Sequence, residues 1–150
     1  MTKILFVCHG NICRSPMAEF VMRDMVQKAG LSDKFEIASC ATSTEEIGNP
    51  VYPPVKKLLS SYGISCDGKT ARQLTKKDYD KYDLLIGMDS ANFRNINRIC
   101  GGDKLNKIHL LMDFTSSPHD VADPWYTRNF DETWKDVNEG CKALLNKIIG

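Results

Sequence analysis

Four short apolar segments are spaced along the chain, and turn-forming or polar residues follow each of them. Residues 4–7, 84–87 and 108–111 are nearly continuous apolar runs, whereas residues 35–39 alternate weakly. Short runs rich in Val, Ile, Leu and Phe are typical of strands that are buried on both faces. We therefore expect four buried strands.

Between these segments, apolar residues recur at the three- and four-residue spacing of helices. Ser15 followed by Pro16 is typical of an N-cap and a first helical position, and Ser90 can cap another helix. Thr75 and Asp78 have the spacing of a capping box. The longest predicted helices cover residues 15–29, 55–62, 90–99 and about 131–148. Residues 40–54 and 112–129 are rich in turn formers and predict long loops.

The alternation of strands and helices predicts the α/β class. We expect one domain over residues 1–150, with a central four-stranded parallel sheet and helices on both faces, in a Rossmann-like three-layer arrangement. In such sheets, ligands bind beyond the carboxyl ends of the strands, at a topological switch point. The loop after the first strand, residues 8–15, is therefore the first candidate for a site.

This loop has the residues of an anion cradle. Successive backbone N–H groups can face inward from such a turn, and the following helix adds its positive N-terminus. Gly10 and Asn11 tolerate the positive φ that the turn requires, and Arg14 offers a planar fork to two oxygens of an oxyanion. This potential is expected to keep Cys8 as a thiolate, with Ser15 as a hydrogen-bond donor. The predicted oxyanion-binding residues are His9, Gly10, Asn11, Ile12, Cys13, Arg14 and Ser15.

Cys8 and Arg14 alone form a weak pattern, because only two positions of seven are fixed. Their place between a buried strand and a Ser-Pro helix start makes the pattern specific. The alternative interpretation is a plain turn with a buried cysteine and a surface arginine. A plain turn would not explain the types of the other residues in the loop. We therefore favour nucleophilic chemistry on a bound phosphoryl group.

Composition argues against several other classes of protein. The net charge is +1, which favours neither nucleic acid nor a membrane as a partner, and no apolar run approaches the ~20 residues of a membrane span. We expect a cytoplasmic protein whose six cysteines form no structural disulfide. No C-x-x-C pair occurs and the three histidines are scattered, so we expect neither a metal nor another cofactor.

The segment Val7–Pro16 resembles the signature loop of the low-molecular-weight protein tyrosine phosphatases. Further markers of the family are Ala41-Thr42-Ser43 with Gly48-Asn49-Pro50, Ala71-Arg72-Gln73, Met88–Asn92 and Asp123-Pro124-Trp125-Tyr126. The resemblance implies a phosphotyrosine phosphatase I-like fold and hydrolysis of phosphotyrosine and small aryl phosphates through a phosphocysteine. It also implies phosphotyrosine-containing proteins as partners, phosphate or other oxyanions as ligands, and a monomer or weak dimer.

The same resemblance implies the roles of individual residues in the reaction. Cys8 is the nucleophile, Arg14 the phosphate clamp, and Asp123 the acid that protonates the leaving oxygen and then the base for water. An Asp-Pro pair is by itself usually a turn, and the neighbours Asp113 and Asp120 are set aside because only Asp123 matches the motif.

Supporting roles follow from the resemblance as well. Asn11 holds the strained loop, Ser15 stabilises the thiolate, and Ser39 braces the loop from outside. Asp89 is expected to interact with the loop through Arg14, to cap a helix, or both, and Asn92 belongs to the same motif.

Cys13 matches a second loop cysteine that can form a reversible disulfide with Cys8, although a passive spacer is an equally good interpretation. Trp125 and Tyr126 are predicted to form the wall of the substrate pocket rather than to pack in the core.

Several positions depart from the family pattern. Glu45 stands at the pocket rim where an aromatic residue is common, Tyr52 and Pro54 replace an Asp and an Arg, and Lys69 replaces a structural His. We expect Glu45 to favour substrates with basic residues beside the phosphotyrosine.

Two other activities occur on the same fold. Arsenate reduction would need two further cysteines close together, whereas Cys66, Cys100 and Cys141 lie far apart in sequence. Phosphoarginine hydrolysis is associated with a threonine at the position of Ile12.

Overall fold

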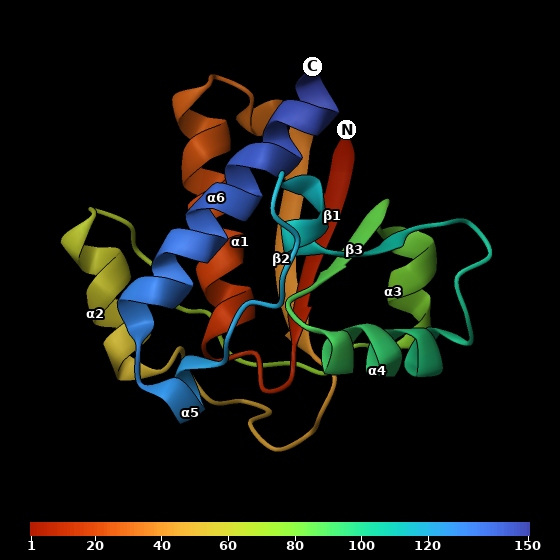
Figure 1. Cartoon of the computed structure of the whole chain (residues 1–150), viewed down its shortest axis with the longest axis horizontal. Helices are drawn as coiled ribbons and strands as arrows, with labels where there is room; N and C mark the ends of the chain where they lie inside the picture. The colour runs from red at the N-terminus through yellow and green to blue at the C-terminus, as the bar shows by residue number, and fades with distance from the viewer.

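The computed structural model describes residues 1–150 and contains one parallel sheet with the strand order β2-β1-β3-β4 (Figure 1). The strands are β1 (Thr2–Cys8), β2 (Phe35–Ala41), β3 (Leu84–Gly87) and β4 (Ile108–Leu110). The predicted fold class is confirmed. Because β1 pairs with β2 on one side and β3 on the other, the chain reverses its direction across the sheet at β1. The carboxyl end of β1 therefore lies at the topological switch point, where ligands bind in such sheets.

Helices cover both faces of the sheet. The helices α1 (Arg14–Lys28), α2 (Pro53–Ser61) and α6 (Phe130–Ile149) lie on one face, and α3 (Lys76–Lys81) and α4 (Ser90–Cys100) lie on the other (Figure 1). The short elements are η1 (Ser32–Lys34), η2 (Leu111–Phe114) and α5 (Pro124–Thr127). None of the helices combines the length and apolarity needed to cross a bilayer.

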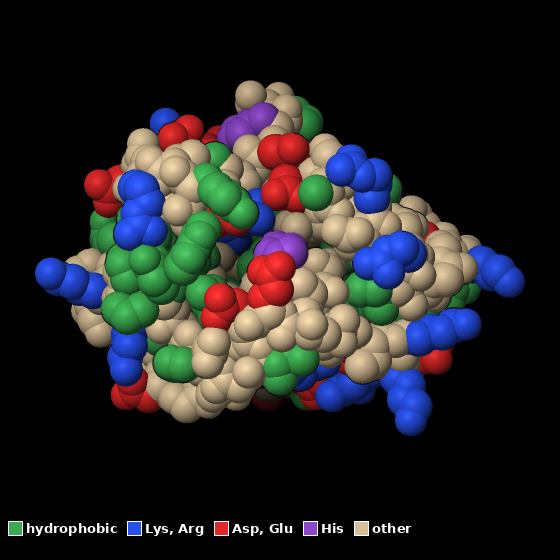
Figure 2. Space-filling view, turned by 90° about the horizontal axis from the view of Figure 1, so that it is seen from below, with side chains coloured by type: hydrophobic (Ala, Val, Ile, Leu, Met, Phe, Trp, Pro, Cys, Tyr) green, Lys and Arg blue, Asp and Glu red, His purple; other side chains and the backbone are tan.

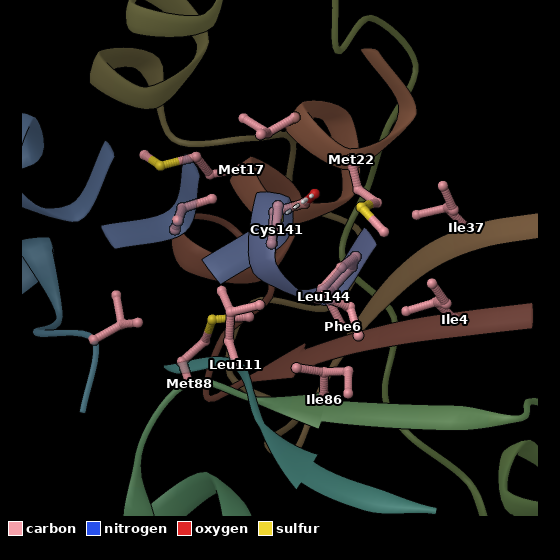
Figure 3. Packing of buried hydrophobic residues seen from close by; sticks show 14 of the residues in the cluster. Ile4, Phe6, Met17, Met22, Ile37, Ile86, Met88, Leu111, Cys141 and Leu144 are labelled. Carbon is pink, nitrogen blue, oxygen red and sulfur yellow. Dashed lines mark hydrogen bonds between the residues drawn. The ribbon is translucent and has the colours of Figure 1, made fainter. Parts of the chain in front are cut away.

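The alternation of side chains along β1 divides the core in two. Ile4 and Phe6 belong to the larger cluster, whereas Leu5 and Val7 belong to the smaller one, and all four are fully buried. In the larger cluster, Met17 and Met22 of α1 and Cys141 and Leu144 of α6 pack over the strands (Figure 3). Each fully buried aliphatic side chain contributes about 1.5–3 kcal/mol to folding, so the two clusters hold β1 firmly in place.

Neither Ser15 nor Ser90 caps its helix as expected, whereas the expected cap at Asp89 is confirmed. The helix α1 begins at Arg14, its N-cap is Cys13, and no side chain caps it. Ser15 lies inside the first turn, where its hydroxyl contacts Cys8 instead. In α4 the N-cap is Asp89 and not Ser90, because the Asp89 carboxylate accepts the N–H of Asn92. The uncapped start of α1 leaves N–H groups free for an anion.

Other boundaries follow the sequence more closely. The capping box of Thr75 and Asp78 is present at α3, and α6 begins at Phe130, one residue before the predicted start. The fourth strand ends at Leu110, because the next residue opens η2. The region predicted as irregular, residues 112–129, contains most of η2 and all of α5.

Candidate active site

The loop between β1 and α1 is a tight turn that depends on Asn11. This residue has φ 60°, in the left-handed region that few residues other than glycine adopt. Its side chain is buried, and Nδ2 donates to Ser15 Oγ at 2.8 Å and to Ser39 Oγ at 2.9 Å. Asn11 Oδ1 accepts the N–H of Arg72 at 3.3 Å. These contacts hold the strained backbone from behind.

Cys8 lies at the base of the turn, with only 3% of its surface exposed. Its Sγ accepts a hydrogen bond from the backbone N–H of Asn11 at 3.3 Å and lies 3.0 Å from Ser15 Oγ. The N–H of Asn11 is thus a donor to the sulfur, and the Ser15 hydroxyl beside it can act as donor or acceptor.

Arg14 begins α1, and its side chain is almost completely buried at the same pocket. Nη1 donates to Asp89 Oδ2 at 2.6 Å and to the carbonyl of Val121 at 2.9 Å. Burial alone would lower the pKa of Arg14, but the charge of Cys8 and the hydrogen bond and charge of Asp89 outweigh it and raise this pKa. The guanidinium therefore stays charged and fixed in direction.

Asp123 approaches from the other end of the chain. It is the N-cap of α5, where Oδ1 accepts the N–H of Trp125 at 3.0 Å. Its second oxygen, Oδ2, lies 3.4 Å from Arg14 Nη2. Trp125 and Tyr126 follow with 46% and 82% of their surface exposed, so neither is a core residue.

These groups line one pocket at the carboxyl end of β1. The pocket brings together most of the predicted site residues: Cys8, His9, Gly10, Ile12, Cys13, Arg14, Glu45, Asp123, Trp125 and Tyr126, and it adds Glu46. Asn11, Ser15 and Ser39 lie behind it and hold the loop. Asp89 reaches the loop through Arg14, whereas Asn92 does not line the pocket and hydrogen-bonds to Asp89 and to the N–H of Met88. The arrangement can bind an oxyanion, attack it with a sulfur and transfer a proton.

Known proteins are similar to this chain in sequence and in fold. The chain matches the family described as low molecular weight phosphotyrosine protein phosphatase over residues 3–149. The low molecular weight protein-tyrosine-phosphatase YfkJ of Bacillus subtilis is 41% identical over 150 residues, which are 99% of this chain and 96% of YfkJ. The chain belongs to this phosphatase family.

Two further comparisons agree with this assignment. The low molecular weight phosphotyrosine protein phosphatase of Rattus norvegicus is 36% identical over 149 residues, which are 96% of this chain and 94% of the rat protein. The crystal structure of YfkJ has a TM-score of 0.96 at 40% identity and covers 99% of this chain and 95% of that one. The predicted family, fold class and enzyme class, a protein tyrosine phosphatase, are confirmed.

In this phosphatase, a buried polar network that is not among the predicted site residues continues behind Ser39. Ser39 Oγ donates to Glu19 Oε1 at 2.6 Å, and Glu19 also pairs with Arg23 at 2.7 Å. Lys69 Nζ donates to the carbonyl of Ser39 at 2.7 Å and lies 3.7 Å from Glu19. Burial lowers the pKa of Lys69, and the charge of Glu19 opposes that effect.

The signal for this network was present in the helix pattern. Glu19 lies four residues after Ser15 and three before Met22, so it shares the buried face of α1 with both. A carboxylate on such a face needs a buried partner. Lys69 is one of those partners.

The remaining loop cysteine differs from Cys8 in its surroundings. Burial, followed by the charge of Cys8, raises the pKa of Cys13 to about 12, so this residue is a neutral thiol near pH 7. No cluster of three or more His, Cys, Asp or Glu side chains in the phosphatase is arranged to hold a metal ion.

Proposed function

We propose that the chain removes phosphate from tyrosine in proteins, and from small aryl phosphates, through a phosphocysteine formed on Cys8. The observation that supports it is the convergence of Cys8, Arg14 and Asp123 on one pocket, although Asp123 is 115 residues from the nucleophile. A nucleophile, an oxyanion clamp and a proton donor in one pocket are what phosphate transfer from an aryl ester requires.

In the first step, the Cys8 thiolate attacks phosphorus and an S–P bond forms. The P–O bond to the tyrosyl oxygen breaks, and protonated Asp123 gives its proton to that oxygen. The sulfur accepts the Asn11 N–H, and as a thiolate it can also accept from the Ser15 hydroxyl 3.0 Å away, which would hold it in line for attack. Tyrosine leaves as the neutral phenol.

In the second step, water attacks the phosphocysteine. Asp123 now accepts a proton from the water, the S–P bond breaks, and the Cys8 thiolate is regenerated with inorganic phosphate as the product. In both steps the equatorial oxygens carry negative charge, which Arg14 and the loop N–H groups stabilise. A bound phosphate would take the place at Arg14 Nη2 that Asp123 approaches in this structure.

The other site residues support these two steps. Trp125 and Tyr126 would form an aromatic wall for the phosphotyrosine ring, and Glu45 lines the same pocket. Asp89 orients Arg14, and Asn92 in turn donates its N–H to Asp89. Ser39 positions the loop through Asn11.

The test compares Cys8→Ser with Cys66→Ser, which changes a cysteine remote from the pocket. We expect wild type and Cys66→Ser to hydrolyse p-nitrophenyl phosphate and a phosphotyrosine peptide in the presence of a chelator, and Cys8→Ser to be inactive. Acid quench and mass spectrometry should find one phosphoryl group on the peptide that contains Cys8. Activity in Cys8→Ser, or a phosphoryl group elsewhere, would contradict the proposal.

The same assay separates the two related activities. A phosphoarginine peptide and arsenate with thioredoxin are supplied at concentrations equal to that of the phosphotyrosine peptide. If either compound is turned over faster than the phosphotyrosine peptide, that compound and not phosphotyrosine is the preferred substrate.

We infer that the phosphatase acts in the cytoplasm on phosphotyrosine-containing proteins, as a monomer or weak dimer. All six cysteines are free thiols, which fits a reducing compartment. Cell fractionation and sedimentation of the purified protein test the location and the oligomeric state, and an exported or tightly dimeric protein would contradict the inference.

A further inference from the structure

The charges that line the pocket are unusual for a site that binds a phosphate dianion. Arg14 is the only Lys or Arg among the lining residues, whereas Glu45, Glu46 and Asp123 are acidic. Asp123 has a place in the reaction, but the two glutamates have none. On this face of the molecule, acidic side chains gather beside a histidine and next to a hydrophobic patch (Figure 2).

Both glutamates belong to a turn that is attached to the catalytic loop. Ser43, just before them, donates to the carbonyl of His9 through its N–H at 3.1 Å and its hydroxyl at 2.8 Å. Glu45 Oε2 lies 2.9 Å from His9 Nε2. The carboxylate of Glu45 is thereby held at the rim, although 68% of its side chain is exposed.

Glu46 is held from two sides. Its Oε2 accepts a hydrogen bond from Asn49 Nδ2 at 2.6 Å. Its Cγ packs over Gly10, only 3.4 Å from where a β-carbon of residue 10 would lie. Glu46 therefore rests on the loop that is expected to receive the phosphate.

Two fixed carboxylates near a dianion oppose its binding, so a bare phosphoryl group gains nothing from them. A cationic side chain beside the phosphoryl group would instead be attracted by the two carboxylates. Arg128 does not line the pocket: it lies over the rings of Tyr52 and Phe130 and donates to the hydroxyl of Tyr52 at 3.1 Å, although its charge acts on Cys13. The acidic rim is therefore the electrostatic feature that a flanking side chain would meet.

We propose that Glu45 and Glu46 select phosphotyrosine segments that carry Lys or Arg next to the phosphotyrosine. This inference rests on the proposed function and adds the class of substrate. Charge complementarity at a rim acts mainly on association rate and on rejection of the wrong partner. The preference should therefore appear in kcat/KM and decrease as salt screens the charges.

The test uses three phosphotyrosine peptides that differ only in their flanking residues, which are Lys, Gln or Glu. With wild type at about 20 mM salt, we expect kcat/KM for the Lys peptide to exceed that for the Glu peptide by about threefold to tenfold. At about 300 mM salt, the ratio should fall below about twofold. Asp33→Asn, which removes an acidic residue of η1 before β2, should keep the wild-type ratio.

Variants of the rim decide whether the glutamates cause the preference. In Glu45→Gln/Glu46→Gln the ratio should approach one, and in Glu45→Lys/Glu46→Lys the Glu peptide should become the better substrate. A reversed preference cannot arise from misfolding. An equal rate for the three peptides in wild type, or a Lys preference retained in the Gln double variant, would overturn the inference.

p-Nitrophenyl phosphate distinguishes the two possible failures, because it has no flanking residues. If wild type hydrolyses it but does not discriminate among the peptides, only the rim inference is wrong. If wild type hydrolyses neither it nor any peptide, the proposed function and the rim inference both fail.

Discussion

Asn11 Nδ2 donates a hydrogen bond to Ser39 Oγ over 2.9 Å, which joins the loop after β1 to the neighbouring strand β2. The same nitrogen holds Ser15, whose hydroxyl lies beside the Cys8 sulfur. One side chain thus connects the shape of the loop, the sheet behind it and the environment of the nucleophile. The left-handed φ of Asn11 is tolerated because these contacts hold it.

Two substitutions at Asn11 separate the backbone from the side chain. Asn11→Gly keeps the positive φ and loses the hydrogen bonds, whereas Asn11→Ala loses both. We expect both variants to lower kcat for p-nitrophenyl phosphate by roughly tenfold or more, because the loop shifts. Asn11→Ala should also be less stable than Asn11→Gly by about 1 kcal/mol in urea unfolding. Unchanged kcat, or the reverse order of stability, would contradict this account.

The sheet and the loop could be predicted from the sequence because both depend on neighbouring residues. Buried strands are continuous apolar runs, and the residues from Cys8 to Ser15 form a local turn. Ser15 and Ser90 are residue types that often cap helices, but neither caps its helix here. The Ser15 hydroxyl contacts the Cys8 sulfur instead. At α4 the Asp89 carboxylate accepts the N–H of Asn92 and also binds Arg14.

Contacts between segments that are distant in the sequence cannot be predicted from local patterns. The carbonyl of Val121 accepts from Arg14, 107 residues away, and it has no side-chain signature. Lys69 meets Glu19 only because the fold brings their segments together behind Ser39. The family resemblance, and not spacing, pointed to Asp123, and its role as the acid stays a prediction.

The role of Asp123 can be tested through the leaving group. Asp123→Asn should lower kcat for phenyl phosphate by about 10²–10⁴-fold, because phenolate is a poor leaving group without a proton. The loss on p-nitrophenyl phosphate should be smaller, since nitrophenolate leaves more readily. Asp120→Asn is the matched control, because Asp120 contacts the Ser90 hydroxyl and does not line the pocket. An equal loss on the two esters would argue against proton donation.

Gly140 marks the place where α6 approaches η2 most closely. A β-carbon at this position would lie 2.5 Å from Leu111 Cγ. Gly140→Ala should lower the free energy of unfolding by about 1–3 kcal/mol despite the better helix propensity of alanine. The measurement is urea unfolding, with Lys142→Ala on the exposed side of the same helix as the control. In the double variant Gly140→Ala/Leu111→Ala, the loss of unfolding free energy should be smaller than the sum of the losses in the two single variants. A loss equal to that sum would count against the close approach.

Cys13 provides a test of redox protection. Because burial raises the pKa of Cys13 to about 12, we expect peroxide to oxidise Cys8 first, to a sulfenic acid. The Cys13 thiol then condenses with it, which forms a disulfide and releases water. Wild type should regain activity after reduction with dithiothreitol, whereas Cys13→Ser should regain clearly less, and Cys66→Ser should behave as wild type. Equal recovery in all three would mean that Cys13 is a passive spacer.

His119 ties the segment before Asp123 to α6, and its charge depends on pH. Its Nδ1 lies 2.7 Å from the carbonyl oxygen of Ser117, and Nε2 lies 3.1 Å from Asp136 Oδ2. The hydrogen bond to Ser117 and then that to Asp136 raise the pKa of His119 above 6.5, and the charge of Glu139 adds to this effect. A raised pKa in the folded state means that the contact stabilises the fold fully below about pH 6.5 and is lost as the pH rises through the folded value.

We therefore expect His119→Gln to be less stable than wild type in urea at about pH 5.5. The difference should shrink as the pH rises above about 6.5 and through the pKa of the folded state. NMR titration of the His119 ring gives that pKa directly. His109→Gln is the control, because His109 forms no ion pair, although its ring contacts the carbonyl of Asn106. A difference between wild type and His119→Gln that grows with pH would show that the protonated ring does not hold this segment.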